Sequence, residues 1–366
     1  MRILFIGDYS DIHSTIARQL RQQGLSVTLL SEEIADGKDN NISIPRRKGL
    51  TGGISYLYKL FNLLPQLKGY DIVQLISSKF FNLSPGKNKY FFERLQQQNG
   101  SLFLTLASND HFYVKACHDA GLFRFSEFKV GNELTEFAKD DPNYFYPWIS
   151  RKYGHWAEYL VEKIDGAISV RPELDMALRS QLGDKLTFAN YPVEVENFPF
   201  LPLELEGPVR FFINMNISTA VQKGSVPLLS MIKSLEREMP DKMTVDVARN
   251  ISPQEYQDKL RQAHVFIDRF YSYSPSKEAL EAMALGKVAA TGAQPEYFDY
   301  IGEQDNNSII PLSFPENDMS DRLRQIILNP QQLKEMSREG RRIVKKNNDV
   351  KIVAERFINH WEKLGK

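Results

Sequence analysis

The sequence predicts an α/β protein made of two Rossmann-like, doubly wound parallel-sheet domains that face a cleft. Three observations carry this prediction. The first thirty residues alternate an apolar run, a helical pattern and a second apolar run. A similar alternation resumes after a proline-rich stretch near residue 200. The chain has 366 residues, more than one compact domain usually holds, so two domains are expected.

Strands and helices alternate through the first half. Residues 3–6 form a continuous apolar run, typical of a strand buried on both faces. Ile16, Ala17 and Leu20 follow at helical spacing, and Gly24 suits a helix stop. Strand, helix and strand at this spacing form a βαβ unit, whose strands must be parallel. Further strands are expected at residues 27–30, 72–76, 102–106, 167–170 and 185–189, and helices at 54–64, 90–98 and 149–163.

Two stretches interrupt this alternation. Residues 112–146 are rich in aromatic side chains and too long for a plain connection, so we expect a functional insertion there. Residues 191–208 are the best linker candidate, because four prolines break any regular element: Pro192, Pro199, Pro202 and Pro208.

The second half has the same architecture without a sequence repeat. Strands are expected at residues 209–213, 243–247, 265–268 and 287–291 and around 309, and helices at 225–238, 253–262, 276–285, 318–328, 331–345 and 350–364. Open α/β sheets bind ligands beyond the carboxyl ends of their strands. The active site is therefore expected between the two domains.

Composition excludes several classes of protein. The 46 Lys and Arg balance 46 Asp and Glu, which argues against a nucleic-acid binder. One cysteine excludes a disulfide framework and fits a reducing compartment. The histidines lack metal-ligand spacing, so no metal site is expected. No uncharged apolar stretch reaches the roughly 18 residues of a membrane span, and a cytoplasmic protein is expected. A dehydrogenase is disfavoured because neither half opens with GxGxxG.

The second half carries the clearest motifs. Lys223-Gly224 opens a helix after a strand, and Glu281 begins a Glu-Ala-Met-Ala stretch that ends at Gly286. An enzyme that releases a nucleoside diphosphate must stabilise the negative charge that develops on the phosphate oxygens, and fixed cations or N–H donors do this. Lys223 before a helix N-terminus suits this need, and Gly224 would let the backbone approach the phosphates. The alternatives are a solvated Lys223 and a Glu281 that merely favours the helix dipole.

These segments resemble the donor-binding domain of GT-B retaining glycosyltransferases, family 4-like enzymes of bacterial surface and capsular polysaccharide synthesis. The resemblance covers essentially the whole chain. It implies transfer of a sugar, with retention, from a UDP- or GDP-linked nucleotide sugar to a glycan or lipid-linked acceptor, without a further cofactor. It implies an acceptor domain at residues 1–195, a donor domain at 196–345 and a C-terminal helix at 346–366 that packs back on the first domain. Lys223 would contact the diphosphate and Glu281 the ribose.

Other candidate site residues follow strand ends. Tyr273, Ser274 and Ser276 stand at the start of the helix expected at 276–285, whose N-terminus suits a phosphate, although Ser274 also suits a helix cap. Gly7 ends the first strand and is a candidate on the diphosphate side of the cleft.

Asp110 and His111 follow the strand at residues 102–106. The resemblance implies that a His or Asp on this loop lies beneath the transferred sugar. Either side chain could stabilise positive charge at the anomeric carbon, and Asp110 is preferred by its position. The alternative is an ordinary loop with a helix-capping residue.

Two features depart from the family pattern. No arginine occurs between Arg210 and Lys223, and Tyr273 occupies the position of the family's first glutamate, for which Glu278 lies too close to Glu281. Candidates for the missing cation are Arg249, Arg269 and Lys277. The departures leave two alternatives open: a catalytically silent homologue that binds nucleotide sugars, and a GT-B epimerase.

A basic segment precedes an apolar helix in the first half. Arg46, Arg47 and Lys48 stand before residues 54–64, which suits peripheral contact with an anionic membrane at its inner face. A buried stripe with solvated neighbours is the alternative that we favour from the sequence.

Overall fold

The computed structural model describes residues 1–32, 41–119, 121–216, 219–312 and 316–365. The chain forms two compact units. The first unit contains Met1–Ala116, Phe145–Pro192 and Val350–Lys366, and the second contains Cys117–Tyr144 and Val193–Asp349. Each unit is built on a parallel sheet with helices, which confirms the predicted α/β fold class.

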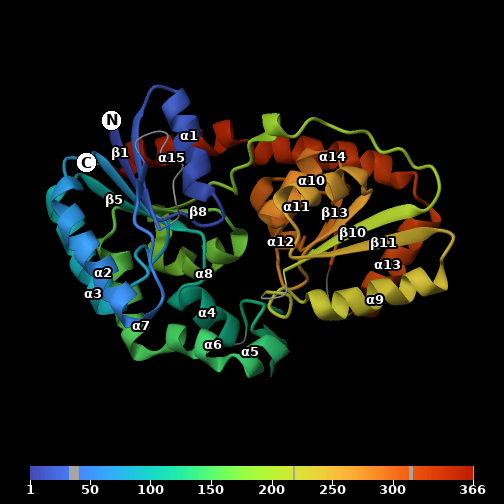
Figure 1. The fold of residues 1–366 in the computed structure, drawn as a ribbon, viewed down its shortest axis with the longest axis horizontal. Coiled ribbons are helices and arrows are strands. Elements are labelled where there is room, and N and C mark those ends of the chain that lie inside the picture. Colours follow the sequence, from blue (N-terminus) through green and yellow to red (C-terminus); the bar gives the residue numbers. More distant parts are fainter. Residues whose placement is uncertain (33–40, 120, 217–218, 313–315, 366) are drawn as a thin grey trace. The chain divides into compact units, whose positions relative to one another are not determined.

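The first unit holds a seven-stranded sheet in the order β3-β2-β1-β4-β5-β8-β9. Figure 1 labels β1, β5 and β8 of this sheet. Its strands are β1 (Arg2–Ile6), β2 (Ser26–Ser31), β3 (Asn41–Ser43), β4 (Ile72–Leu75), β5 (Ser101–Leu106), β8 (Gly166–Ser169) and β9 (Leu186–Phe188). The helices along this part of the chain are α1 (Ile12–Gln22), α2 (Gly49–Leu63), α3 (Pro85–Gln98), α4 (His111–His118), α6 (Pro142–Ile149), α7 (Arg151–Lys163), α8 (Pro172–Leu182) and α15 (Val350–Leu364). The strand order reverses between β1 and β4, where open sheets of this kind bind ligands.

A chain of buried hydrogen bonds crosses the first sheet. His13 donates from Nδ1 to the Gly7 carbonyl (2.8 Å), and its Nε2 accepts from the Thr105 hydroxyl (2.8 Å). Gln74 donates to Thr105 (2.9 Å) and accepts from the Trp361 indole (2.7 Å). Burial lowers the pKa of His13 to about 3, so its ring stays neutral and keeps an acceptor for Thr105. Because Trp361 belongs to α15, the last helix is tied into the first unit, as predicted.

The second unit holds a five-stranded parallel sheet in the order β11-β10-β12-β13-β14. Its strands are β10 (Val209–Met215), β11 (Met243–Arg249), β12 (Val265–Ile267), β13 (Val288–Thr291) and β14 (Ile309–Pro311). Its helices include α9 (Ser225–Glu238), α10 (Pro253–Gln262), α11 (Lys277–Ala284), α12 (Pro295–Ile301), α13 (Glu316–Leu328) and α14 (Gln332–Asn347). The segment Cys117–Tyr144 adds the antiparallel pair β6 (Lys129–Val130) and β7 (Glu133–Leu134) and the helix α5 (Glu136–Asp140).

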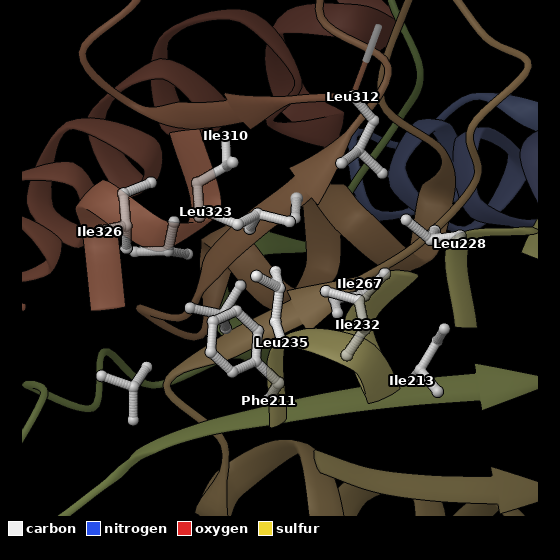
Figure 2. Close-up of a cluster of buried hydrophobic side chains, with 14 of the residues drawn as sticks. Phe211, Ile213, Leu228, Ile232, Leu235, Ile267, Ile310, Leu312, Leu323 and Ile326 are labelled. Carbon is white, nitrogen blue, oxygen red and sulfur yellow. The ribbon is translucent and has the colours of Figure 1, made fainter. Parts of the chain in front are cut away.

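Apolar side chains join α9 and α13 to one face of the second sheet (Figure 2). Phe211 and Ile267 come from neighbouring strands and are buried beside Ile232 of α9 and Leu323 of α13. Since a buried aliphatic or aromatic side chain contributes about 1.5–3 kcal/mol, this cluster is a main source of stability for the unit.

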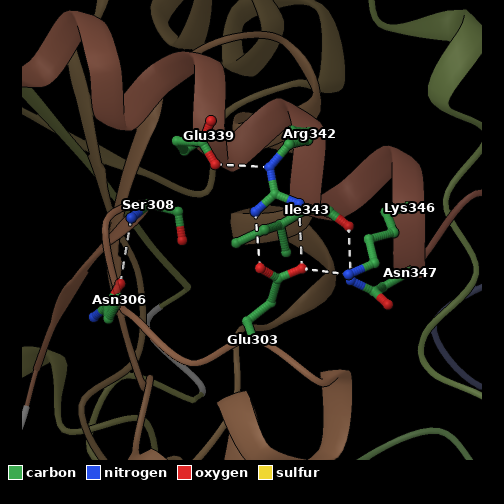
Figure 3. A network of polar contacts seen from close by, with 8 residues as sticks. All are labelled: Glu303, Asn306, Ser308, Glu339, Arg342, Ile343, Lys346 and Asn347. Atoms are coloured by element: carbon green, nitrogen blue, oxygen red, sulfur yellow. Dashed lines mark hydrogen bonds and ion pairs between the residues drawn. The ribbon is translucent and has the colours of Figure 1, made fainter.

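An ion-pair network ties the end of α12 to α14 (Figure 3). Glu303 accepts from Arg342 (2.8 Å) and from Lys346 (2.8 Å), and Arg342 also pairs with Glu339 (2.7 Å). Hydrogen bonding to Arg342 is the main reason that the pKa of Glu303 falls to about 2. The network therefore holds a surface loop at the end of α12 against the next long helix.

One domain assignment is corrected by the structure. Cys117–Tyr144 belongs to the second unit, whereas the sequence placed it in the N-terminal domain at residues 1–195. The Tyr273 hydroxyl accepts from the Arg124 N–H (2.6 Å), and its ring stacks on Phe125 with centroids 4.9 Å apart. Arg124 also forms two hydrogen bonds with Glu296, of 2.6 and 3.0 Å. These long-range contacts hold the aromatic-rich insertion on the second unit.

Helix α2 turns a different face inward from the one its periodicity indicates. Tyr56 and Leu60 are buried, and the Tyr56 hydroxyl donates to Glu32 (2.7 Å). Four apolar side chains of this helix are instead exposed: Leu50 (82%), Ile54 (62%), Tyr58 (67%) and Phe61 (45%). The expected buried stripe is therefore wrong at Ile54, Tyr58 and Phe61. Within the described part of the chain, no helix has the length and apolar character needed to cross a membrane.

Candidate functional site

In the second unit, two loops that follow neighbouring parallel strands meet at Lys223. The first loop follows β10 and ends at Gly224, which begins α9. The second follows β12, and its Phe270 N–H donates to the Lys223 carbonyl (2.9 Å). Both loops lie at the carboxyl edge of the sheet, where α/β proteins place their ligands.

Gly224 is required by this meeting of loops. Its φ is +70°, a left-handed conformation that favours glycine. A Cβ atom here would stand 3.0 Å from the Phe270 Cβ and from the Tyr271 ring. Gly224 thus allows the second loop to pack against the first. The close approach of its backbone to a diphosphate stays a prediction.

The charge cluster of this unit is centred on Glu278, in the first turn of α11. Burial alone would raise the pKa of Glu278, but the charges of Lys223 and Arg269, together with hydrogen bonds from the Glu278 N–H and Ser276, outweigh burial and lower it. Arg269 comes from the loop after β12, and its Nε is 3.9 Å from the Asp268 carboxylate. That Nε is buried without a hydrogen-bond partner among the described residues.

The contacts of this cluster distinguish among the three candidates for the cation that the motif lacks. Arg269 acts on the same carboxylate as Lys223, as a replacement cation should. Lys277 pairs instead with Glu281 (3.8 Å), and Arg249 is exposed at the end of β11. Of the motif positions that lack the arginine, Ile217 and Ser218 lie outside the described residues.

Glu281, the predicted ribose ligand, has a partly exposed carboxylate that pairs with Lys277. The buried Tyr256 hydroxyl of α10 faces the same group of carboxylates: burial first, then Glu278, Glu281 and Asp268, raise its pKa. It has no hydrogen-bond partner within the described parts of the chain. Nothing in the sequence near Tyr256 indicates a place in a functional site, because a tyrosine within a helical pattern is typical of a core residue.

The three second-rank candidates are engaged in packing and capping. Tyr273 is 2% exposed and holds Arg124 and Phe125, as described above. Ser276 is the N-cap of α11 and accepts from the Ala279 N–H (3.3 Å). Ser274 is buried, and its carbonyl accepts from the Ser272 hydroxyl (2.7 Å). Their binding of a donor stays a prediction.

In the first unit, Gly7 has a structural reason for being glycine. Its φ is +79°, and a Cβ would lie 2.3 Å from the Ile76 side chain. The neighbouring Asp8 carboxylate accepts from the N–H groups of His13 (2.9 Å) and Ser14 (3.2 Å). The loop after β1 is therefore locked onto the first turn of α1.

Asp110 caps α4. Its carboxylate accepts from the Tyr113 N–H (2.8 Å), the side chain is 5% exposed, and burial raises its pKa to about 6. This geometry matches the capping interpretation. His111 is 9% exposed and donates from Nδ1 to the Trp148 carbonyl (2.8 Å), which fixes the plane of its ring.

Helix α7 positions the two loops that follow β4 and β5. The Trp156 indole donates to the Ser78 carbonyl (2.8 Å) in the first of these loops. Gly154 lets the His111 ring lie against the helix, since a Cβ there would stand 3.1 Å from the His111 Cε1. Among the described residues, no group of three or more His, Cys, Asp or Glu side chains is placed to hold a metal ion.

Comparison with solved structures identifies the architecture. Sucrose-phosphate synthase from Thermosynechococcus elongatus matches with a TM-score of 0.63 and 14% identity over 100% of this chain and 99% of that one. Anabaena HepE in complex with UDP-glucose matches with a TM-score of 0.62 and 12% identity over 100% of both chains. The lipopolysaccharide outer core galactosyltransferase WaaB matches with a TM-score of 0.57 and 13% identity over 99% of both chains.

At these identities the likeness establishes the fold, which is that of GT-B glycosyltransferases. No protein-family model matches the chain, and no curated protein matches it in sequence.

The two interpretations of Asp110 differ in a measurable way. Asp110→Asn should keep the helix cap, because asparagine is as good an N-cap as aspartate, whereas Asp110→Ala should lower the free energy of unfolding by about 1 kcal/mol. Because the folded-state pKa of about 6 exceeds the ordinary value of 3.8, the folded chain binds this proton more tightly than the unfolded chain. The contribution of Asp110 to stability should thus decrease as pH rises between about 4 and 6.

Denaturant unfolding from pH 4 to 7 checks this expectation. Asp110→Asn should gain stability relative to the native chain as pH rises through that window. Parallel pH curves for the two proteins would contradict a buried, proton-binding Asp110.

Proposed function

We propose that this protein transfers a sugar from a nucleotide-sugar donor to a glycan or lipid-linked acceptor, with retention at the anomeric carbon. The second unit would bind the donor and the first unit the acceptor. One observation carries the proposal: the loops that bear Lys223 and Arg269 pack against each other at the carboxyl edge of the second sheet, where both cations lower the pKa of Glu278. The fold supports it, since structures with this fold include an Anabaena protein in complex with UDP-glucose.

Two cations of the cluster suit a nucleoside diphosphate. Lys223 and Arg269 lie among the carboxylates of Glu278 and Asp268, and both cations would also attract the phosphate oxygens of a donor. In transfer, the bond from the sugar's anomeric carbon to the diphosphate breaks and a bond from the acceptor oxygen forms. Negative charge grows on the leaving diphosphate, and Lys223 and Arg269 would stabilise it.

Two carboxylates complete the proposed donor site. Glu281, partly exposed one turn from Glu278, would accept hydrogen bonds from the ribose hydroxyls. Glu278 would keep both cations in place before the donor arrives. Arg269 thereby supplies the charge that the motif lacks, which favours an active enzyme over a silent homologue.

His111 is the side chain of the first unit best suited to the reacting sugar. Its Nδ1–H is committed to the Trp148 carbonyl, so a neutral ring keeps Nε2 as an acceptor in a fixed direction. Asp110, in contrast, is occupied with its helix cap. We therefore propose His111 as the contact beneath the transferred sugar.

Nucleotide binding tests the donor site. In thermal-shift titrations with UDP, UDP-glucose and GDP, a bound nucleotide should raise the midpoint of unfolding by mass action. Lys223→Met and Arg269→Met should each weaken nucleotide binding by about tenfold or more, since each removes a charge-assisted contact worth roughly 1.5–3 kcal/mol. The exposed Arg249→Gln is the matched control and should bind as the native chain does.

Two results would count against this site. Unchanged binding by Arg269→Met would remove Arg269 as the replacement cation. The absence of any shift with all three nucleotides at millimolar concentration would favour a homologue without donor binding.

We further propose that α2 rests on an anionic membrane surface, where a lipid-linked acceptor would lie. Leu50, Ile54, Tyr58 and Phe61 are exposed on this helix. Residues 41–70 contain five Lys or Arg and no Asp or Glu, which complements anionic lipid headgroups.

Vesicle sedimentation tests the membrane contact. The native chain should bind phosphatidylglycerol vesicles and release them at high salt. The double variant Ile54→Ser, Tyr58→Ser should bind about tenfold more weakly, because it removes apolar area that would enter the interface. Leu328→Ser on α13, also an exposed apolar residue, is the control. Equal binding by the double variant would exclude α2 as the contact.

A further inference from the structure

A second group of cations lies in the first unit, at the carboxyl end of β4. Lys79 stands in the loop that follows this strand, and its ammonium group is 5.8 Å from the centroid of the Trp148 ring. The loop is fixed in place, because the Trp156 indole donates to the Ser78 carbonyl (2.8 Å) and the Lys79 N–H donates to the Ser77 hydroxyl (3.1 Å). The backbone that carries Lys79 is thus held by hydrogen bonds on both sides of the residue.

Lys79 is half-buried in the part of the chain that the structure describes. Within the described residues, its ammonium forms no ion pair or hydrogen bond. Burial lowers the pKa of Lys79, and the nearby charge of Arg46 lowers it further. Glu32 acts in the opposite direction, but its carboxylate already accepts from the Tyr56 hydroxyl (2.7 Å) and the Asn82 N–H (3.2 Å).

Lys79 and Arg46 are therefore two cations near one carboxylate, that of Glu32, whose hydrogen bonds come from other groups. A buried charge without a partner costs free energy, so proteins pair such charges or use them to bind a ligand. An oxyanion placed beside Lys79 would relieve both its desolvation and its repulsion by Arg46.

The location of Lys79 connects it to the candidate site. In the sheet order, β4 lies between β1, which precedes Gly7, and β5, which precedes Asp110 and His111. The carbonyl group of Trp148 accepts the Nδ1–H of His111 (2.8 Å). Lys79, Trp148 and His111 thus lie in one part of the first unit.

We propose that Lys79 and Trp148 bind an anionic group, a phosphate or a carboxylate, carried by the sugar acceptor. The Lys79 ammonium meets the oxyanion, Arg46 adds a second positive charge, and the Trp148 ring offers an apolar face to the adjoining sugar. This inference rests on the proposed function, in which the first unit binds the acceptor. It narrows the acceptor to an acidic glycan or a phosphorylated one.

The indole N–H signal of Trp148 in ¹⁵N-labelled full-length protein reports on this site. The chain has three tryptophans, and Trp148→Phe assigns the signal. Inorganic phosphate and D-glucuronate are titrated at constant ionic strength, with D-glucose as the neutral comparison. Because phosphate should also reach the donor cations, the titrations are repeated in Lys223→Met.

The signal should shift saturably with phosphate or glucuronate in the native chain, in Lys223→Met and in Lys79→Arg. In Lys79→Gln the affinity should fall by about tenfold or more. Lys87→Gln, an exposed lysine of the same unit, should behave as the native chain does. A tighter response to phosphate would indicate a phosphorylated acceptor, and a tighter response to glucuronate would indicate an acidic sugar.

An unshifted Trp148 signal, or equal affinity in Lys79→Gln, would overturn the proposal, as would an equal response to glucose. UDP binding separates its failure from that of the proposed function. Lys79→Gln should bind UDP as the native chain does. A native chain that binds no UDP would contradict the donor site, but the Trp148 titration would still report whether Lys79 binds an anion.

Discussion

The attraction of Glu278 for Lys223 and Arg269 is the interaction on which the proposed donor site depends. The two cations come from different loops, so they act on one carboxylate only where those loops pack closely. Gly224 permits that packing, since any Cβ would press on Phe270 and Tyr271. The parallel sheet supplies the frame, because β10 and β12 are neighbours and both loops leave the same edge. Sheet topology, one glycine and one carboxylate thus bring two positive charges together at the carboxyl edge of the sheet.

The first unit uses the same arrangement with different residues. Loops after β1, β4 and β5 leave neighbouring strands, and each is tied to a helix: Asp8 to α1, and Ser78 and His111 to α7. Within the described residues, Lys79 forms no ion pair at this edge. Rigid loops and incomplete charge compensation are what an anion-binding surface needs, because pre-placed cations lose little freedom when the ligand arrives.

The fold could be predicted because buried parallel strands are continuous apolar runs, as at β1, and because these runs alternate with helical patterns. The placement of Cys117–Tyr144 in the second unit could not be predicted, since Arg124 and Tyr273 are far apart in sequence and meet only in the folded chain. Periodicity located the apolar residues of α2 but did not show which face of the helix is buried. The buried face is the one that carries Tyr56, whose hydroxyl donates to Glu32. At the proposed donor site, sequence spacing predicted Lys223 and Glu281. It discounted Glu278, because proximity to a cation on another strand's loop has no local signature.

The most direct test of the donor site is ³¹P NMR of UDP titrated with the native protein. The account predicts that both phosphorus signals shift or broaden on binding, because the diphosphate lies against Lys223 and Arg269 and experiences their charge. The same titration with Lys223→Met should leave both signals close to those of free UDP. Binding of UDP that leaves the phosphorus signals of the native complex unchanged would place the diphosphate away from these cations and contradict the account.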